Sequence, residues 1–244
     1  MKILIKYPTK GRRGLFEDTL RNIQHTISGE NEHRIEVTLD GDDISMNDFN
    51  VLDDKHKHVT LRYGQSLSKI HACNRDMDII TANYDWDILV LMSDDMKWVV
   101  NYWDRILVNK VYKIGSLDCF LHFNDGYLGE KLPTMSIMGR EYYERFFYIY
   151  PPCYKSFSCD AEAMFVAQML NKWHYYDEVI FKHEHPANNP MLAKYDETYH
   201  LASKHSQHDI DTYFKRMQKL FYVNNPVTIP GILKAEMEAK GWLN

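Results

Sequence analysis

The first half of the chain alternates short apolar runs with longer amphipathic stretches. Four runs of strand length each end in a polar or glycine-containing segment: Ile3 to Tyr7, Ile35 to Leu39, Val59 to Tyr63 and Asp87 to Met92. Apolar residues at helical spacing fill two of the intervals, Leu15 to Ile27 and Ser68 to Thr81. Strands that alternate with helices predict a largely parallel sheet with crossover helices. The ligand crevice of such a sheet lies at the carboxyl ends of its strands.

The second half is less regular. Its pattern predicts strands at Cys119 to Phe123, at Thr134 to Met138 and in an aromatic-rich segment from Trp173 to Phe181. It predicts helices at Trp103 to Val111, Glu141 to Phe147, Asp160 to Leu170, Asp209 to Phe221 and Pro230 to Gly241. The sequence contains neither an internal repeat nor a Pro/Gly/Ser linker. We therefore expect one α/β domain over residues 1–200, with a helical extension over residues 201–244 packed on it.

The composition narrows the class of protein. The 244 residues carry a formal net charge of -5, whereas a protein whose main task is to coat nucleic acid is basic. The four cysteines form no CxxC pair, which favours reduced thiols in a cytoplasmic protein over a structural zinc site. The longest apolar run, Ile88 to Met92, is far shorter than the ~20 residues of a membrane span. The N-terminus also lacks the pattern of a signal peptide.

Paired carboxylates follow two of the predicted strands. Ser93-Asp94-Asp95 comes directly after the most apolar strand, and Asp40-Gly41-Asp42-Asp43 ends the second one. Adjacent carboxylates at the end of a buried strand are costly unless something neutralises them. A divalent cation does so, because it takes carboxylate oxygens together with substrate phosphates. The alternative is a pair of solvated turns.

Two further motifs offer metal ligands or a proton acceptor. His183 and His185 share one face of an extended segment, and imidazole binds Mn-like metals; the alternative is a pair of hydrogen-bonding histidines. Asp160 and Glu162 lie at the start of a predicted helix, where the helix dipole keeps a carboxylate ionised. Such a carboxylate can take a proton from a hydroxyl nucleophile. The alternative is a helix cap with a second acid in the first turn.

A basic loop, Lys10 to Arg13, follows the first strand. Unless it is merely solvated, it lies where a phosphate or nucleotide binds in an open α/β sheet. The loop lacks the P-loop pattern, and the chain has neither a G-x-S-x-G elbow nor a GxGxxG fingerprint. Hydrolase and dinucleotide-binding functions therefore have no motif support.

The order of these pieces resembles the GT-A glycosyltransferases of the family-2-like group. The pieces are a basic loop after the first strand, an acidic second strand end, Gly64 to Asn74 leading into a helix, Ser93-Asp94-Asp95-Met96, Asp160-x-Glu162 and a late histidine. The resemblance covers residues 1–200. It implies a Rossmann-like α/β fold, in which a mostly parallel central sheet is flanked by helices, with a helical C-terminal tail.

The resemblance also assigns roles to residues. It makes Asp95 the ligand of Mn²⁺ or Mg²⁺, completed by His183 or else His185, and Asp160 the catalytic base, with Glu162 as the rival. It implies a nucleotide-sugar donor, with a UDP-sugar favoured, and inversion at the anomeric carbon. The donor-binding residues that we expect are Pro8, Thr9, Lys10, Arg12, Asp40, Asp42, Lys69, Asn74 and Asp94.

Three other stretches are similar to small glycosyltransferases encoded by bacteriophages: Asn124 to Tyr127, Ile137 to Arg140 and Tyr148 to Pro152. Some of these enzymes modify hydroxymethylated pyrimidines in DNA, which makes such DNA a candidate acceptor and the host cytoplasm a candidate location. Scattered basic and aromatic residues form either a solvated surface or a groove for DNA: Lys55, Lys57, Arg62, Lys69, His71, Trp103, Tyr127, Lys204, His205, Lys215, Arg216 and Lys219.

Other acceptors and other functions stay open from the sequence. A polysaccharide, a lipid-linked glycan or a protein is the alternative acceptor. A sugar nucleotidyltransferase also pairs an α/β sheet with metal-binding acids, but a Gly-rich N-terminal phosphate loop is expected there, and this loop has only Gly11 and Gly14. A non-catalytic carbohydrate-binding domain is the third possibility, and it would bind its ligand without metal.

Overall fold

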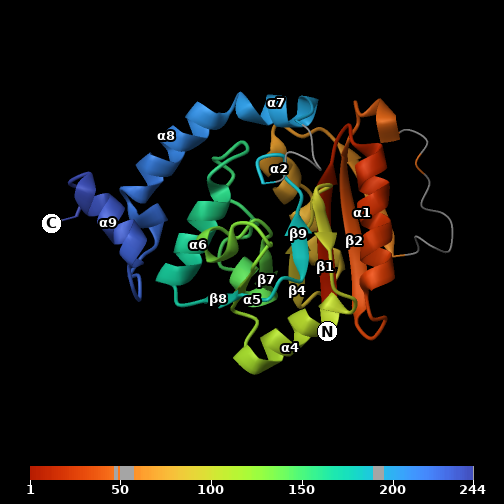
Figure 1. Cartoon of the computed structure of the whole chain (residues 1–244), viewed down its shortest axis with the longest axis horizontal. Coiled ribbons are helices and arrows are strands. Elements are labelled where there is room, and N and C mark those ends of the chain that lie inside the picture. Colours follow the sequence, from red (N-terminus) through yellow and green to blue (C-terminus); the bar gives the residue numbers. More distant parts are fainter. Residues whose placement is uncertain (47–48, 50–57, 189–194, 244) are drawn as a thin grey trace.

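The computed structural model describes residues 1–46, 49, 58–188 and 195–243. Over these residues the chain forms a seven-stranded sheet in the order β3-β2-β1-β4-β7-β6-β8, beside a two-stranded pair of β5 and β9 (Figure 1). The strands are β1 (Lys2–Thr9), β2 (Glu32–Asp40), β3 (Val59–Gly64), β4 (Ile88–Leu91), β5 (Met96–Trp98), β6 (Phe120–Phe123), β7 (Ile137–Gly139), β8 (Trp173–Tyr176) and β9 (Phe181–His183).

Helices cover both faces of the sheet. The α-helices are α1 (Arg13–Thr26), α2 (Lys69–Asn74), α3 (Met77–Asn83), α4 (Trp103–Ile114), α5 (Arg140–Tyr143), α6 (Cys159–Met169), α7 (Glu197–Ser203), α8 (Ser206–Met217) and α9 (Gly231–Ala239). Short 3₁₀ turns are η1 (Ile44–Met46), η3 (Gly129–Lys131) and η4 (Leu220–Tyr222). The structure thus confirms the predicted α/β class.

Side chains of β1 divide the core into two layers. Ile3, Ile5 and Tyr7 pack with buried residues of α1 and α4, whereas Leu4 packs with α2, α3, α5 and α6. A strand covered on both faces has no solvent side, which explains why β1 and β4 read as continuous apolar runs.

The sheet is parallel across β3, β2, β1 and β4, and β7 then runs antiparallel between β4 and β6. The first four strands therefore all place their carboxyl ends at one edge, where they end at Thr9, Asp40, Gly64 and Leu91. This edge is where the candidate chemistry gathers.

Local pattern misplaced several elements. The predicted strand from Trp173 to Phe181 is two strands, β8 and β9, in different sheets. The predicted helix from Ser68 to Thr81 breaks into α2 and α3 at Asp76, whose backbone is left-handed with φ 67. Both β5 and α7 were missed, and the expected boundary between residues 200 and 201 falls inside α7.

The C-terminal helices pack against the outer side of α6. Met164, Phe165 and Met169 of α6 form a buried cluster with Met217 of α8 and Leu233 of α9. Figure 1 shows α7 and α8 in succession along one side of the molecule. No helix in the described ranges is long and apolar enough to cross a membrane.

Candidate functional site

Asp94 lies buried at the carboxyl end of β4. Because β1 and β4 are parallel neighbours, the end of β1 reaches this carboxylate: Tyr7 Oη donates to Asp94 Oδ1 at 3.0 Å, and Thr9 Oγ1 donates to Asp94 Oδ2 at 3.0 Å. Burial raises the pKa of Asp94 to about 7, although the two hydroxyl hydrogen bonds and the charge of Arg12 lower it. The two hydroxyls thus fix the carboxylate, and no lysine or arginine of the described residues forms an ion pair with it.

Asp95 has a different environment although it is the next residue. The antiparallel pairing of β5 with β9 sets Met96 opposite His183, which brings His183 Nε2 to 3.4 Å from Asp95 Oδ2. Ser93 Oγ donates to Asp95 Oδ1, and Tyr199 Oη donates to Asp95 Oδ2 at 2.7 Å. Burial alone would raise the pKa of Asp95, but His183, Lys69 and Ser93 hold it well below the usual range. Asp95 is therefore ionised at neutral pH.

Asp95 and His183 fit a divalent cation as a carboxylate–imidazole pair. The Nδ1 atom of His183 is buried with no partner among the described residues, so no second hydrogen bond fixes the tautomer of the ring. Over the same residues, no group of three or more His, Cys, Asp or Glu side chains is arranged to hold a metal ion. The other ligands would have to be substrate oxygens and water, as is usual for hard cations bound with nucleotide phosphates.

His185 faces a different set of neighbours. Its Nδ1 accepts the backbone N–H of Ala187 at 3.1 Å. Its ring centroid lies 5.5 Å from that of His183 and 4.7 Å from that of Tyr199. Burial and the charge of His183 lower the pKa of His185. His183 is therefore the better placed of the two predicted ligands.

The loops after β1 and β2 are held together by charge. Lys10 Nζ lies 3.0 Å from Asp40 Oδ2 and 2.9 Å from Asp42 Oδ1. Burial would raise the pKa of Asp40, but hydrogen bonds from Ser66 and Lys10 lower it. Lys10 and Asp42 are largely exposed, so their contacts can be exchanged for those of a ligand, whereas Asp40 is buried in the loop.

Arg75 holds the ends of β2 and β3 from beneath. Its guanidinium donates to the backbone oxygens of Leu39 and Arg62 at 2.8 and 3.0 Å, and to Ser66 Oγ at 2.9 Å. A Cβ at position 64 would lie 3.0 Å from the guanidinium carbon, so a larger residue there would push the guanidinium aside. No pattern in the sequence pointed to this role of Arg75.

Arg12 is bound by the helix that crosses the strand ends. Its Nε and Nη2 atoms donate to the two carboxylate oxygens of Asp196, each at 2.7 Å. The guanidinium carbon lies 4.1 Å from the ring centroid of Tyr199. Because Asp196 and Tyr199 begin α7, this helix contacts the basic loop through Arg12.

Asp160 approaches the same site from α6. The helix begins at Cys159, and the residue before it, Ser158, has left-handed backbone with φ 63, so Asp160 lies in the first turn rather than at the cap. Burial raises the pKa of Asp160, while the Ala161 N–H and the charges of Lys69 and His183 lower it. Lys69, at the start of α2, is exposed and has no ion-pair partner within the described ranges. Lys69 and His183 thus act on both Asp95 and Asp160.

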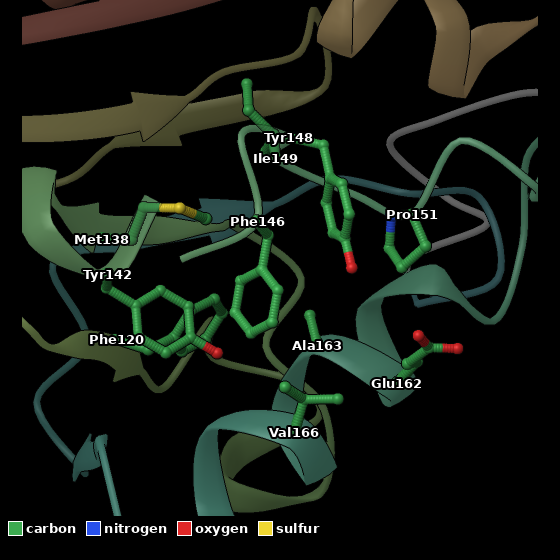
Figure 2. A pocket seen from close by; sticks show the side chains of 10 residues that line it. All are labelled: Phe120, Met138, Tyr142, Phe146, Tyr148, Ile149, Pro151, Glu162, Ala163 and Val166. Atoms are coloured by element: carbon green, nitrogen blue, oxygen red, sulfur yellow. The ribbon is translucent and has the colours of Figure 1, made fainter. Parts of the chain in front are cut away.

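Glu162 is turned away from this site. Its carboxylate is 1% exposed, accepts a hydrogen bond from Tyr154 Oη at 2.6 Å and pairs with Arg216 Nη2 at 2.7 Å and Nε at 2.8 Å. Figure 2 shows Glu162 beside a small pocket lined by Tyr148 and Phe146. The pocket volume of about 20 Å³ holds about one water molecule, so it is no substrate site.

Two of the expected donor-binding residues have structural roles. Asn74 donates from Nδ2 to the Tyr150 backbone oxygen at 2.7 Å, and its Oδ1 accepts the N–H groups of Ile149 and Tyr150. Both ends of the Asn74 amide are thus hydrogen-bonded to backbone groups of Ile149 and Tyr150. Pro8 is paired within the sheet opposite Thr38, where it adjoins the site only through its chain neighbour Thr9.

The residues suggested for a DNA groove do not form one surface. Trp103 is fully buried and stacks on Trp98 with centroids 3.8 Å apart. Arg62 pairs with Glu36, and Arg216 pairs with Glu162. Lys55 and Lys57 lie outside the described residues.

No family model and no curated protein sequence matches the chain. Its fold, in contrast, is similar to that of several solved structures. The chain is similar to the mannosyltransferase PcManGT from Pyrobaculum calidifontis in complex with GDP-Man and Mn²⁺, with a TM-score of 0.62 and 14% identity, covering 98% of this chain and 69% of that one. It is similar to S. aureus TarS 1-349 in complex with UDP-GlcNAc, with a TM-score of 0.58 and 12% identity, covering 90% of this chain and 70% of that one. The likeness establishes the fold: the chain has the GT-A glycosyltransferase fold.

Proposed function

We propose that the protein is a metal-dependent glycosyltransferase that moves a sugar from a nucleotide-sugar donor to an acceptor hydroxyl. One observation carries the proposal. A carboxylate after β4, Asp95, and a second carboxylate at the start of α6, Asp160, are both within electrostatic reach of the same two side chains, His183 and Lys69. Glycosyl transfer needs both, one toward the leaving diphosphate and one toward the attacking hydroxyl. The similar folds that hold GDP-Man with Mn²⁺ and UDP-GlcNAc support the same reading.

Residues at the strand ends would bind the donor. In this proposal Asp95 and His183 hold Mn²⁺ or Mg²⁺, which supplies Lewis-acid stabilisation of the leaving diphosphate. Asp94 stays fixed by Tyr7 and Thr9 and faces the ribose. A UDP-sugar is the favoured donor, with its nucleotide against Thr9, Lys10 and Arg12 and with Asp40 and Asp42 toward the base or ribose.

Asp160 would act on the acceptor. Its pKa is raised by burial, which makes it a better proton acceptor than an exposed aspartate. It takes the proton of the acceptor hydroxyl while that oxygen attacks the anomeric carbon, and the bond to the nucleoside diphosphate breaks on the opposite face. The product is therefore inverted. Lys69 is placed to steady the negative charges on either side.

The acceptor that we propose first is a hydroxymethylated pyrimidine in DNA, on the sequence resemblance to phage enzymes. A polysaccharide, a lipid-linked glycan or a protein is the alternative. Lys69, His71 and Lys204 have no ion-pair partners among the described residues. Such side chains suit an anionic acceptor, whether it is DNA or an anionic glycan. Salt distinguishes DNA, because phosphate contacts release counterions and weaken steeply with ionic strength.

One screen tests the function. The protein is incubated with Mn²⁺, a panel of UDP- and GDP-sugars, and hydroxymethylcytosine DNA, hydroxymethyluracil DNA, unmodified DNA or simple glycans. Mass spectrometry then detects the transferred sugar. We expect release of nucleoside diphosphate that stops in excess chelator and returns with added Mn²⁺. Release of pyrophosphate instead would identify a nucleotidyltransferase, and undiminished transfer in excess chelator would rule out the metal. Transfer to glycans alone would exclude DNA as the acceptor.

A further inference from the structure

Helix α7 meets two of the proposed donor-binding groups at once. Its N-cap residue, Asp196, takes both hydrogen bonds that the edge of the Arg12 guanidinium can offer, at 2.7 Å each. One turn later Tyr199 donates its hydroxyl to Asp95 at 2.7 Å. Figure 1 shows the helix across the carboxyl ends of the strands, where a nucleotide would enter. These contacts join α7 to the site and not to the hydrophobic core, since no residue of α7 is buried.

The Asp196–Arg12 pair has the geometry of a phosphate complex. Two parallel N–H donors on a planar guanidinium match two oxygens of a carboxylate or of a phosphate equally well. The Arg12 side chain is 8% exposed and Asp196 is 39% exposed, so Asp196 is the partner that can leave toward solvent. A diphosphate arriving at the basic loop would compete with Asp196 for the same pair of donors.

Tyr199 makes the corresponding contact on the acidic side. Its hydroxyl uses Asp95 Oδ2, the oxygen that also lies 3.4 Å from His183 Nε2. The ring is held between the Arg12 guanidinium at 4.1 Å and the His185 ring at 4.7 Å. A cation held between Asp95 and His183 would compete with the tyrosine hydroxyl for this oxygen.

We propose that α7 is an autoinhibitory element of the donor site, in which Asp196 takes the place of the donor diphosphate on Arg12 and Tyr199 takes the place of the cation on Asp95. The inference rests on the proposed glycosyltransferase function. Donor and cation bind only when α7 has left, and they lose apparent affinity in proportion to the closed population. Binding of one ligand frees the helix, and so favours binding of the other.

Two substitutions weaken or remove one contact each while keeping the helix-forming residues of α7. Asp196→Asn abolishes the charge but keeps a good N-cap, because asparagine caps helices as well as aspartate does. Tyr199→Phe removes the hydroxyl but keeps the ring over Arg12. Glu197→Gln is the matched control: it removes one negative charge from the exposed first turn of α7 without touching Arg12 or Asp95.

Calorimetric titration of each variant with UDP and Mn²⁺, and with GDP and Mn²⁺, measures the affinity directly. We expect the Kd of the nucleotide to fall about tenfold in Asp196→Asn, as for a competitor held closed in about nine molecules of ten. Tyr199→Phe should likewise lower the Kd of Mn²⁺ and, because both contacts hold the same helix, each variant should also improve binding of the other ligand. Glu197→Gln should leave both Kd values unchanged. Hydrogen exchange of residues 197–203 in the wild-type protein should become faster when UDP and Mn²⁺ are added.

The outcomes separate the inference from the function on which it rests. Suppose that the wild-type protein binds nucleotide with Mn²⁺ and that both variants bind with equal or lower affinity. Then α7 does not inhibit donor binding and the autoinhibition is wrong, while the proposed function stands. Slower exchange of α7 with ligand would lead to the same conclusion. If neither the wild type nor any variant binds UDP or GDP with Mn²⁺, the proposed donor site itself is wrong, and the inference with it.

Discussion

Two groups of carboxylates, one at the strand ends and one around α6 and α8, use the same residue types in opposite ways. At the strand ends Asp94 and Asp95 are held by hydroxyls and by His183, with no arginine or lysine ion pair among the described residues. Around α8, Glu162 pairs with Arg216, and the buried Asp209 accepts the N–H groups of Lys155, Ser156 and Phe157. Asp160 lies on α6, but it is grouped with the strand-end carboxylates, because Lys69 and His183 act on its pKa as they act on that of Asp95.

The difference separates carboxylates that can react from carboxylates that hold the fold. A buried acid with a fixed cation or three backbone donors has its charge fully compensated, so nothing is left to bind a ligand. Asp94 is held only by hydroxyls and its pKa is raised to about 7, whereas Asp95 beside His183 stays ionised without a lysine or arginine ion pair among the described residues and can take a cation. Asp209 and Arg216 of α8 thereby fix the loop and the first turn around Asp160, so the C-terminal helices serve the site without entering it.

The largest expected effect is at Asp95. In Asp95→Ala we expect turnover to fall by about 10²- to 10³-fold, the scale for removing one preorganised stabiliser of transition-state charge. Steady-state rates with saturating donor and Mn²⁺ measure it. Normal turnover in this variant would mean that Asp95 does not bind the cation. The strand-end carboxylates would then not differ in function from the structural ones around α8.

A second test compares Asp160 with Glu162. Asp160→Asn should fold normally, still bind nucleotide and lose about 10²-fold or more in turnover, because a general base is lost. Glu162→Gln should keep most of its turnover per folded molecule and lose stability, since its partner Arg216 is left half-paired. Calorimetric nucleotide binding and thermal unfolding accompany the rate measurements. If Glu162→Gln loses most of its turnover while Asp160→Asn stays nearly normal, Glu162 is the catalytic base and Asp160 is not.

The structural group is probed by Arg216→Met. This change leaves the Glu162 carboxylate buried with Tyr154 as its remaining partner, and breaking a buried pair from one side costs about 3 kcal/mol. Urea unfolding gives the free energy of unfolding. Lys215→Met, in which an exposed neighbour loses the same charge, is the control and should change the free energy little. Equal losses in both variants would mean that the Glu162–Arg216 pair contributes nothing specific.

A pH-dependent effect on stability is expected from Lys6, which lies fully buried on β1 and donates to Thr38 and to the Arg75 backbone oxygen at 2.7 Å. Burial lowers its pKa from 10.5 to about 8, against the charge of Asp76. Between pH 8 and 10.5 the unfolded chain therefore binds one more proton than the folded chain. Stability from this group rises with pH across that window.

Comparison with Lys6→Met isolates this contribution. The variant should lack the rise in unfolding free energy between pH 8 and 10.5 that the wild type gains from Lys6, as measured by denaturant unfolding at each pH. Parallel pH profiles for the two proteins would show that Lys6 has an ordinary pKa in the folded state.

Much of the donor side could be predicted from the sequence. Apolar periodicity reports which local segments are buried, so the strands that precede Thr9, Asp40 and Asp94 were recognisable. Parallel strands with crossover helices then place their carboxyl ends together as a matter of geometry. That is why Lys10, Asp40 and Asp42 could be expected to meet, and in the structure they do.

The tertiary structure decided which side chains complete the site. His183 reaches Asp95 only because β5 pairs with β9, and the segment around β9 reads locally as a continuation of β8. Asp160 and Glu162 look interchangeable at a helix start, until the partners from α8 occupy one of them. Asp196 meets Arg12 across 184 residues of sequence, and Tyr199 meets Asp95 across 104. Local pattern encodes burial and period, whereas these contacts depend on how distant elements pack, which no short window of sequence contains.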